Sequence, residues 1–241
     1  MTNYIREMSG KQYLERLKET DTVIIPLGAC EIYGPHLPMG QDLIVADRIA
    51  QIVAEKTNAL IAPTIEIGES SALDTFQSTF SIPRSVIEGF LDYLVGKLLE
   101  DGFKNLLFIS GHAGNVEIIN YIIKKYQKNH DFKAAQVDWW RFTQHHTQEI
   151  LDFSGPMAHG HAAECGTSVM MYLYPELVDE KEICKVEPKE NKFGDIITIE
   201  TLDKKTDNGI VGDATTATKE KGEQVVKVCV DRIIEYMNEK F

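Results

Sequence analysis

Apolar residues along the chain fall into two kinds of run. The short runs are rich in β-branched residues and are typical of buried strands; they cover 22–29, 59–68, 104–111 and 134–140. The long runs carry apolar residues at helical spacing and cover 42–57, 85–102, 115–129, 163–178 and 220–241. This alternation predicts an α/β fold with a mostly parallel sheet and helices on both faces.

The boundaries of these helices carry recognisable signals. Asp42 and Ser85 are suited to cap the first two helices, and Pro175 to end the fourth. The segment 182–213 is polar and is expected to be irregular. Because the chain shows no linker, repeat or low-complexity tract, residues 1–241 are expected to form a single domain.

Three polar clusters follow predicted strands directly: 30–36, 110–115 and 138–140. In open α/β sheets, ligands bind outside the carboxyl ends of the strands. We therefore expect the three loops to open on the same edge of the sheet.

The first of these clusters, with Asp42 shortly behind it, offers a mixed set of metal donors. Glu31 and Asp42 supply carboxylates and His36 an imidazole, a mixture that zinc, manganese and iron accept. A surface turn without a ligand is an equally open interpretation, because Gly-Pro turns ahead of a helix are common.

The second cluster, "SGHAGN", places His112 between a strand and a helix. Its small residues let the backbone approach a ligand closely. A helix N-terminus also favours an anion, so a phosphate loop is a competing interpretation. The GxxxxGK[ST] pattern is missing, which argues against nucleotide binding.

Further candidates lie later in the chain. His161 and Glu164 are three residues apart and would share a face if the helix began near His161. The alternative is a polar helix start with a favourable glutamate in its first turn. Trp139 and Trp140 could line a pocket wall at a strand end or belong to the core.

The amino-acid composition limits the kinds of binding partner and the cell compartment that are expected for this protein. The net charge of −12 argues against nucleic acid or an anionic membrane surface. The four cysteines are far apart and form no CxxC pair, as expected of reduced thiols. Residues 1–17 lack the apolar segment of a secretory signal, and no apolar run approaches ~20 residues. A cytoplasmic protein is expected.

Four motifs together resemble the creatininase (creatinine amidohydrolase) family. They are E-x-x-G-P-H-L-P-x-x-x-D from Glu31, S-G-H-x-G-N from Ser110, H-A-x-E-x-x-T-S from His161 and G-x-x-G-D-x-x-x-A-T-x-E-K-G from Gly209. They follow the family's order and span most of the chain. The resemblance implies an α/β fold, a hexamer, a small-molecule substrate and one or two divalent metal ions (Zn, Mn or Fe).

The resemblance also implies roles for individual residues. Glu31, Asp42, His112 and Glu164 are the implied metal ligands, with Asp42 as the carboxylate that would bridge two ions. His161 matches a histidine that moves protons. His36 and Trp139 are expected to meet substrate, and Tyr33 to take part in catalysis.

The chain departs from the family pattern at several positions. Tyr33 stands where the family usually has a metal-binding histidine. Gly114 stands where creatininase itself draws a further carboxylate, but other members have glycine there, and for them the resemblance implies the glutamate that corresponds to Glu164. Gly166 replaces the glutamate of the family's E-T-S, and Ser78 replaces a glycine in the middle segment 69–83. These changes leave the number of metal ions and the substrate open.

The leading hypothesis is a metal-dependent hydrolase that cleaves a carbonyl-containing bond, such as a cyclic amide, in a small cyclic substrate. One alternative is hydrolytic C–C cleavage of a cyclic diketone derived from inositol. A second alternative, from another class, is a non-catalytic metabolite-binding protein on the same fold, and a third is a protein whose metal is structural.

Overall fold

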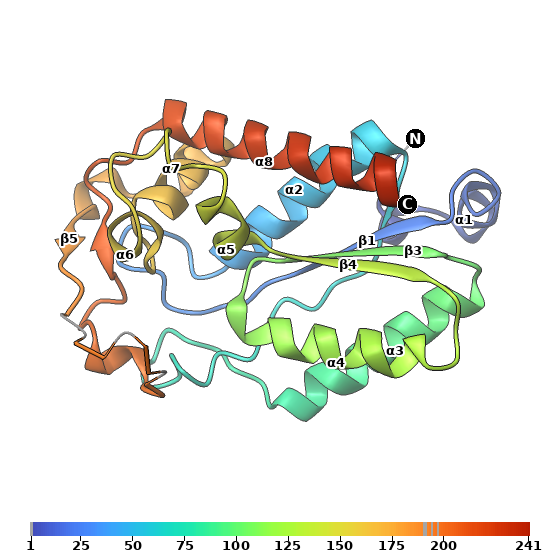
Figure 1. The fold of residues 1–241 in the computed structure, drawn as a ribbon, viewed down its shortest axis with the longest axis horizontal. Helices are drawn as coiled ribbons and strands as arrows, with labels where there is room; N and C mark the ends of the chain where they lie inside the picture. Colours follow the sequence, from blue (N-terminus) through green and yellow to red (C-terminus); the bar gives the residue numbers. More distant parts are fainter. Residues whose placement is uncertain (1, 190–191, 194, 197) are drawn as a thin grey trace.

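The computed structural model describes residues 2–189, 192–193, 195–196 and 198–241. Its main sheet has four parallel strands in the order β2-β1-β3-β4, and a small antiparallel sheet pairs β5 with β6 (Figure 1). The strands are β1 (Thr22–Leu27), β2 (Leu60–Ile61), β3 (Asn105–Ser110), β4 (Lys133–Asp138), β5 (Lys185–Val186) and β6 (Gly212–Asp213).

The helices connect these strands and cover the main sheet. The α-helices are α1 (Gly10–Arg16), α2 (Gln41–Thr57), α3 (Arg84–Glu100), α4 (Val116–Gln127), α5 (Trp139–Gln144), α6 (Pro156–His159), α7 (Glu164–Leu173) and α8 (Lys219–Lys240). The 3₁₀ helices are η1 (Ile5–Glu7), η2 (Ala113–Asn115), η3 (Pro175–Leu177), η4 (Glu180–Glu182) and η5 (Leu202–Lys204).

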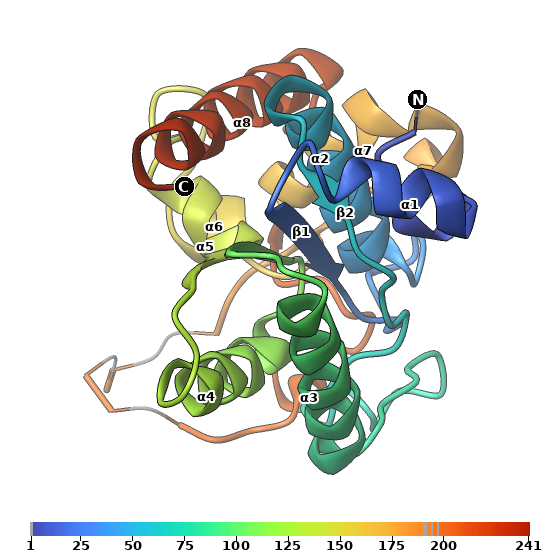
Figure 2. The ribbon, with the colours of Figure 1, turned by 90° about the vertical axis from the view of Figure 1, so that its right-hand side faces the viewer.

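The main sheet lies between two helical layers. Side chains alternate along a strand, so Ile24 of β1 packs into the apolar cluster under α2, α7 and α8. Its neighbours Val23 and Ile25 pack into a second cluster under α3 and α4. Figures 1 and 2 show α2 and α8 on one side of the sheet and α3 and α4 on the other. The predicted single α/β domain with a mostly parallel sheet is confirmed.

Several predicted boundaries differ from the structure. The strand expected over 59–68 is only Leu60–Ile61, and the strand expected over 134–140 ends at Asp138, where α5 takes over. Asp42 does not cap α2, because Gly40 is the N-cap and Asp42 is the second helical residue. α3 likewise begins one residue before Ser85. Two consecutive tryptophans suit a strand or a helix equally, so the apolar pattern did not locate the start of α5.

The segment 182–213, expected to be irregular, contains η5 and the short strands β5 and β6. Residues 190, 191, 194 and 197 of this segment lie outside the described residues. All four cysteines are free. Among the helices that the structure describes, none is both long and apolar enough to cross a membrane.

Candidate metal centre

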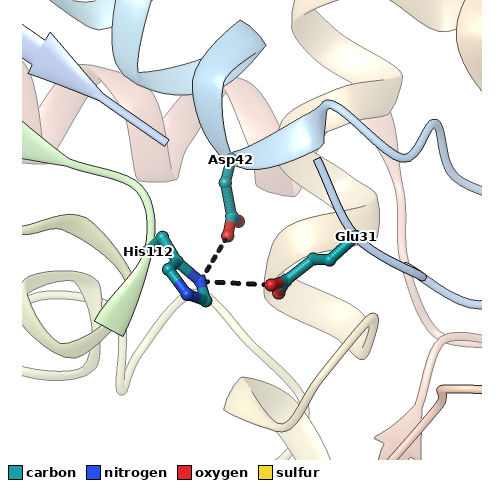
Figure 3. A group of neighbouring side chains, drawn as sticks. All are labelled: Glu31, Asp42 and His112. Atoms are coloured by element: carbon teal, nitrogen blue, oxygen red, sulfur yellow. Dashed lines mark hydrogen bonds and ion pairs between the residues drawn. The ribbon is translucent and has the colours of Figure 1, made fainter. Parts of the chain in front are cut away.

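The loops that follow β1 and β3 meet the start of α2 at the carboxyl edge of the sheet. Glu31 comes from the first loop, Asp42 from the first turn of α2 and His112 from the second loop. One ligand atom from each of the three side chains lies within 4.8 Å of the others (Figure 3). The expected convergence of these loops is therefore present in the structure.

A close backbone approach makes this convergence possible. A methyl group on Gly111 would lie 2.1 Å from the backbone oxygen of Asp42, so only glycine lets α2 start directly against the end of β3. The three donor side chains are buried, with exposures of 1% for Glu31, 2% for Asp42 and 6% for His112. The cluster therefore lies below the surface.

The imidazole of His112 is held between the two carboxylates and a backbone carbonyl. Its Nδ1 lies 3.2 Å from Asp42 Oδ2 and 3.4 Å from Glu31 Oε2. Its Nε2 donates to the backbone oxygen of Glu69 at 2.7 Å. A hydrogen bond from the other ring nitrogen is the usual way to fix a metal-binding histidine, and here it turns Nδ1 toward the carboxylates.

Each carboxylate is oriented by a further donor. The Ser70 hydroxyl donates to Glu31 Oε2 at 2.5 Å, and the indole N–H of Trp140 donates to Asp42 Oδ1 at 2.8 Å. These partners come from the segment after β2 and from α5. Together with His112, these donors hold the two carboxylates in place from three separate segments.

His161 joins the same cluster from the turn between α6 and α7. Its Nδ1 donates to the Gly209 oxygen at 2.6 Å, and its Nε2 lies 3.3 Å from Glu31 Oε1. The ring stacks on Tyr33 with centroids 4.2 Å apart. The next residue, Ala162, has a left-handed backbone (φ 56°), a strained conformation of the kind that concentrates at functional sites.

Burial and the neighbouring charges shift the pKa values of the ionisable groups in this cluster in opposite directions. Burial raises the pKa of Glu31, but hydrogen bonds to His112 and His161 outweigh it and hold that pKa well below its usual range. Burial lowers the pKa of His112, but its two carboxylate partners raise it well above the ordinary value. Burial raises the pKa of Asp42 more than its contacts to His112 and Trp140 lower it.

Two neighbouring groups respond to the same carboxylates. Burial lowers the pKa of His161, but the contact to Glu31 more than reverses this and leaves the pKa raised. Burial and the nearby carboxylates raise the pKa of Tyr33 well above 10, so the phenol stays protonated at neutral pH. Among the described residues, no lysine or arginine forms an ion pair with Glu31 or Asp42.

A cavity of about 230 Å³ adjoins the cluster. His161, Tyr33 and Trp140 separate it from the buried carboxylates, and Ala113, next to His112, is also in its wall. The remaining wall comes from β4, α5 and the α6–α7 turn: Asp138, Arg141, Gln144, His159, Gly160, Ala162, Cys165 and Gly166. A small molecule in this cavity would therefore lie against the cluster.

Glu164 does not lie with the other expected ligands. Its side chain is fully buried, and its carboxylate accepts from the Lys221 ammonium at 2.6 Å and from the Asp152 backbone N–H at 2.9 Å. The ligand role of Glu164 was implied by the resemblance, and the side chains of Glu164 and His161 would share a face only if the helix began near His161. Instead α7 starts at Glu164, and the left-handed turn at Ala162 separates the two side chains.

His36 and Trp139, expected to meet substrate, are placed behind the cavity wall. His36 is buried with its Nε2 2.9 Å from the Thr167 hydroxyl of α7. Trp139 is fully buried in the apolar core, and its neighbour Trp140 takes the position in the cavity wall. The helical turn of α5, which the sequence did not predict, causes this exchange.

Comparison with known proteins identifies the family. The sequence pattern of the Creatininase family, described as creatinine amidohydrolase, matches residues 6–237. The chain belongs to the creatininase family. A creatinine amidohydrolase of Pseudomonas putida is 28% identical in an alignment 257 positions long, gaps included. The alignment covers 99% of this chain and 97% of the relative. A 3-dehydro-scyllo-inosose hydrolase of Thermotoga maritima is 29% identical, over 95% of this chain and 80% of the relative.

The fold comparison agrees. A solved structure described as "Creatininase Mn" has a TM-score of 0.86 and 26% identity, and the match covers 100% of this chain and 99% of the other. As a member of the creatininase family, the protein is a metal-dependent hydrolase. This class excludes the non-catalytic alternative.

Several contacts in this creatininase-family site and around it were not predicted from the sequence. Ser70 lies in the polar segment 69–83, where nothing distinguishes it from its neighbours. Lys221 was visible within the E-K-G motif, but its partner Glu164 lies 57 residues earlier. The choice of Trp140 over Trp139 depends on where β4 ends, which the apolar pattern left open.

Proposed function

We propose that this protein hydrolyses a carbonyl-containing bond in a small cyclic substrate, using one divalent ion held by Glu31, Asp42 and His112. The observation that carries the proposal is the buried donor cluster, which contains two carboxylates and no lysine or arginine partner among the described residues. Buried carboxylates are costly unless a cation balances them.

The donor set fits zinc, manganese or iron(II). One imidazole and two carboxylates suit these ions, and the neutral Nδ1 of His112 would be the nitrogen ligand. When bound, such an ion supplies Lewis acidity, which polarises a carbonyl and lowers the pKa of water. Ser70, Trp140 and the Glu69 carbonyl would keep the three ligands in orientation.

The residues present favour one ion over two. Tyr33 offers a protonated phenol in place of a histidine. A side chain cannot be added at Gly114, because its first carbon would lie 2.0 Å from the Glu69 oxygen. Glu164 is already neutralised by Lys221. None of the three positions discussed for a further ligand therefore supplies a free metal donor.

His161 is suited to move a proton during hydrolysis. Its Nδ1–H is engaged by the Gly209 oxygen, so Nε2 is the atom that exchanges the proton. That atom faces Glu31, and the ring also lines the cavity. We propose that Nε2 protonates the leaving group, and that the Tyr33 hydroxyl donates a hydrogen bond to the substrate.

The size of the cavity supports a small substrate. About 230 Å³ suffices for a single substituted ring but is below the range usual for larger ligands. A cyclic amide is one candidate. The similarity to a 3-dehydro-scyllo-inosose hydrolase makes C–C cleavage of an inositol-derived cyclic diketone the second candidate. The expected hexamer and cytoplasmic location remain predictions.

This proposal is tested by removing the metal ion from the protein and then adding it back. Chelator-treated protein should lose turnover of creatinine or of an inositol-derived diketone, whichever it accepts. Zinc, manganese or iron(II) should restore turnover and reach its full effect at one ion per chain. Turnover that survives removal of all metal, or that requires two ions per chain, would contradict the proposal.

A further inference from the structure

One polar side chain in the cavity wall has no role in the metal centre or in the fold. Asp138 ends β4 and lines the cavity. Its side chain is 13% exposed, and both carboxylate oxygens are buried without a hydrogen-bond partner among the residues that the structure describes. Leaving a buried polar group unbonded is unfavourable, so a group retained in this state requires an explanation.

Neighbouring protein groups do not supply that explanation. The Nε of Arg141 lies 3.4 Å from Asp138 Oδ2, but the arginine side chain is 69% exposed. An ion pair so open to water contributes little. Asp138 also occupies the N-cap position of α5, but its side chain makes no capping hydrogen bond of ordinary geometry. Burial raises the pKa of this carboxyl more than the nearby guanidinium and backbone N–H of Arg141 lower it. The carboxylate therefore has hydrogen-bonding capacity left for a group in the cavity.

A second buried group without a partner lies behind the same cavity. Gln41 is fully buried, and neither its amide nitrogen nor its amide oxygen has a hydrogen-bond partner within the described part of the chain. A methyl group on Gly166, which lines the cavity, would lie 2.9 Å from Gln41 Nε2. Two polar side chains around one small cavity thus have unused hydrogen-bonding capacity.

We propose that Asp138 is a specificity-determining residue that binds two adjacent hydrogen-bond donors of the substrate. An ionised carboxylate only accepts hydrogen bonds, and its two oxygens can accept a pair of neighbouring donors. Vicinal hydroxyls and amidine-type N–H groups both present such a pair. The substrate is then a donor-rich ring whose carbonyl faces the metal centre. This inference rests on the proposed function, which places the substrate in this cavity.

Matched ring compounds test the inference on the full-length, metal-loaded protein. The donor-rich probes are an inosose, a six-membered ring ketone with vicinal hydroxyls, and creatinine, a cyclic amide with amidine-type N–H groups. The donor-poor counterparts are cyclohexanone and 2-pyrrolidinone. Calorimetry gives the dissociation constant of each, or KM where a probe is hydrolysed. The variants are Asp138→Asn and, as a control, Asp131→Asn, which changes an exposed carboxylate just before β4.

At least one donor-rich probe should bind more tightly than its donor-poor counterpart. Asp138→Asn should weaken that binding by about tenfold or more, as expected for a lost hydrogen bond to a charged group. Asp131→Asn should not, and all proteins should hold the same amount of metal. The preferred probe distinguishes hydroxyl from amidine donors.

Equal affinity in wild type and Asp138→Asn, or no preference for either donor-rich ring, would overturn the inference. Metal content separates this failure from failure of the proposed function. If the protein holds its ion but shows no dependence on Asp138, only the inference about specificity falls. If the wild-type protein holds no ion, the proposed function falls.

Discussion

Two glutamates, one in each half of the chain, are buried to the same degree but balanced in different ways. Glu164 and Glu31 are 0% and 1% exposed. Glu164 has a permanent cation, the Lys221 ammonium at 2.6 Å, which also pairs with Asp152 at 2.9 Å. Among the described residues, the side-chain partners of Glu31 are the Ser70 hydroxyl and two histidines, and one of them, His112, also contacts a second buried carboxylate, Asp42.

The difference separates a structural site from a binding site. The charge of the buried Glu164 carboxylate is balanced by the Lys221 ammonium, so this site needs no external cation. The ion pair links the start of α8 to the start of α7. Two buried carboxylates with only histidine partners can bind an external cation, because imidazole is itself a metal ligand when neutral. The charge partners of the two glutamates, and not their burial, distinguish their roles.

The largest effect is expected from His161, the residue beside Glu31 that we propose transfers the proton. His161→Gln should lower kcat by about 10²–10⁴-fold on the substrate identified by metal-dependent turnover, while metal content stays unchanged. His159→Gln is the matched control, because His159 lines the same cavity but has its Nε2 3.2 Å from Thr147. A loss of less than about fivefold would exclude His161 from the chemistry.

Loss of Lys221, the partner of Glu164, should lower the stability of the fold and leave metal binding unchanged. Lys221→Met leaves a buried carboxylate unpaired and should lower the free energy of unfolding by about 3–5 kcal/mol, measured by urea denaturation. Lys227→Met, which breaks an exposed pair with Asp231, should leave the midpoint unchanged. Equal midpoints for the two variants would remove the distinction between the two glutamates.

His36 is a third buried ionisable group, and it needs no charged partner because it is neutral at pH 7. Burial lowers its pKa from 6.5 to about 4. Between these values the unfolded chain binds a proton that the folded chain does not, so acidification lowers the free energy of unfolding. The loss should reach up to about 3 kcal/mol below pH 4 and should be absent above pH 7.

Denaturation across pH 4–7 measures this effect. His36→Gln should flatten the acid side of the stability profile, whereas the exposed His130→Gln should not. Identical profiles for wild type and His36→Gln would show that this histidine does not carry the acid sensitivity.

The smallest effect concerns the orientation of Asp42. Trp140→Phe removes the indole N–H that lies 2.8 Å from Asp42 Oδ1, and it should weaken metal affinity by about 10–100-fold. Trp139→Phe is the control: it changes the core, and metal affinity should stay within about threefold of wild type. The reverse ranking, measured by competition with a chelating indicator, would contradict the assignment.

The sequence predicted what depends on local pattern. The order of strands and helices followed from apolar periodicity, and the loops of Glu31 and His112 were expected on one edge because parallel strands end there. The resemblance to the family added Asp42 to them as a metal ligand. Contacts between distant segments were not predictable: Lys221 meets Glu164 across 57 residues, and one left-handed residue, Ala162, separates His161 from Glu164. The exchange of Trp139 for Trp140 has the same origin, since it depends on one boundary at Asp138.

The most direct test of the account is the metal content of three proteins, measured by elemental mass spectrometry after purification and dialysis against manganese or zinc. Folding of each is confirmed by circular dichroism. We expect one ion per chain in the wild type, none in Asp42→Asn and one in Glu164→Gln. Loss of the ion in folded Glu164→Gln, or its retention in Asp42→Asn, would contradict the central claim that the cation site is the Glu31 cluster.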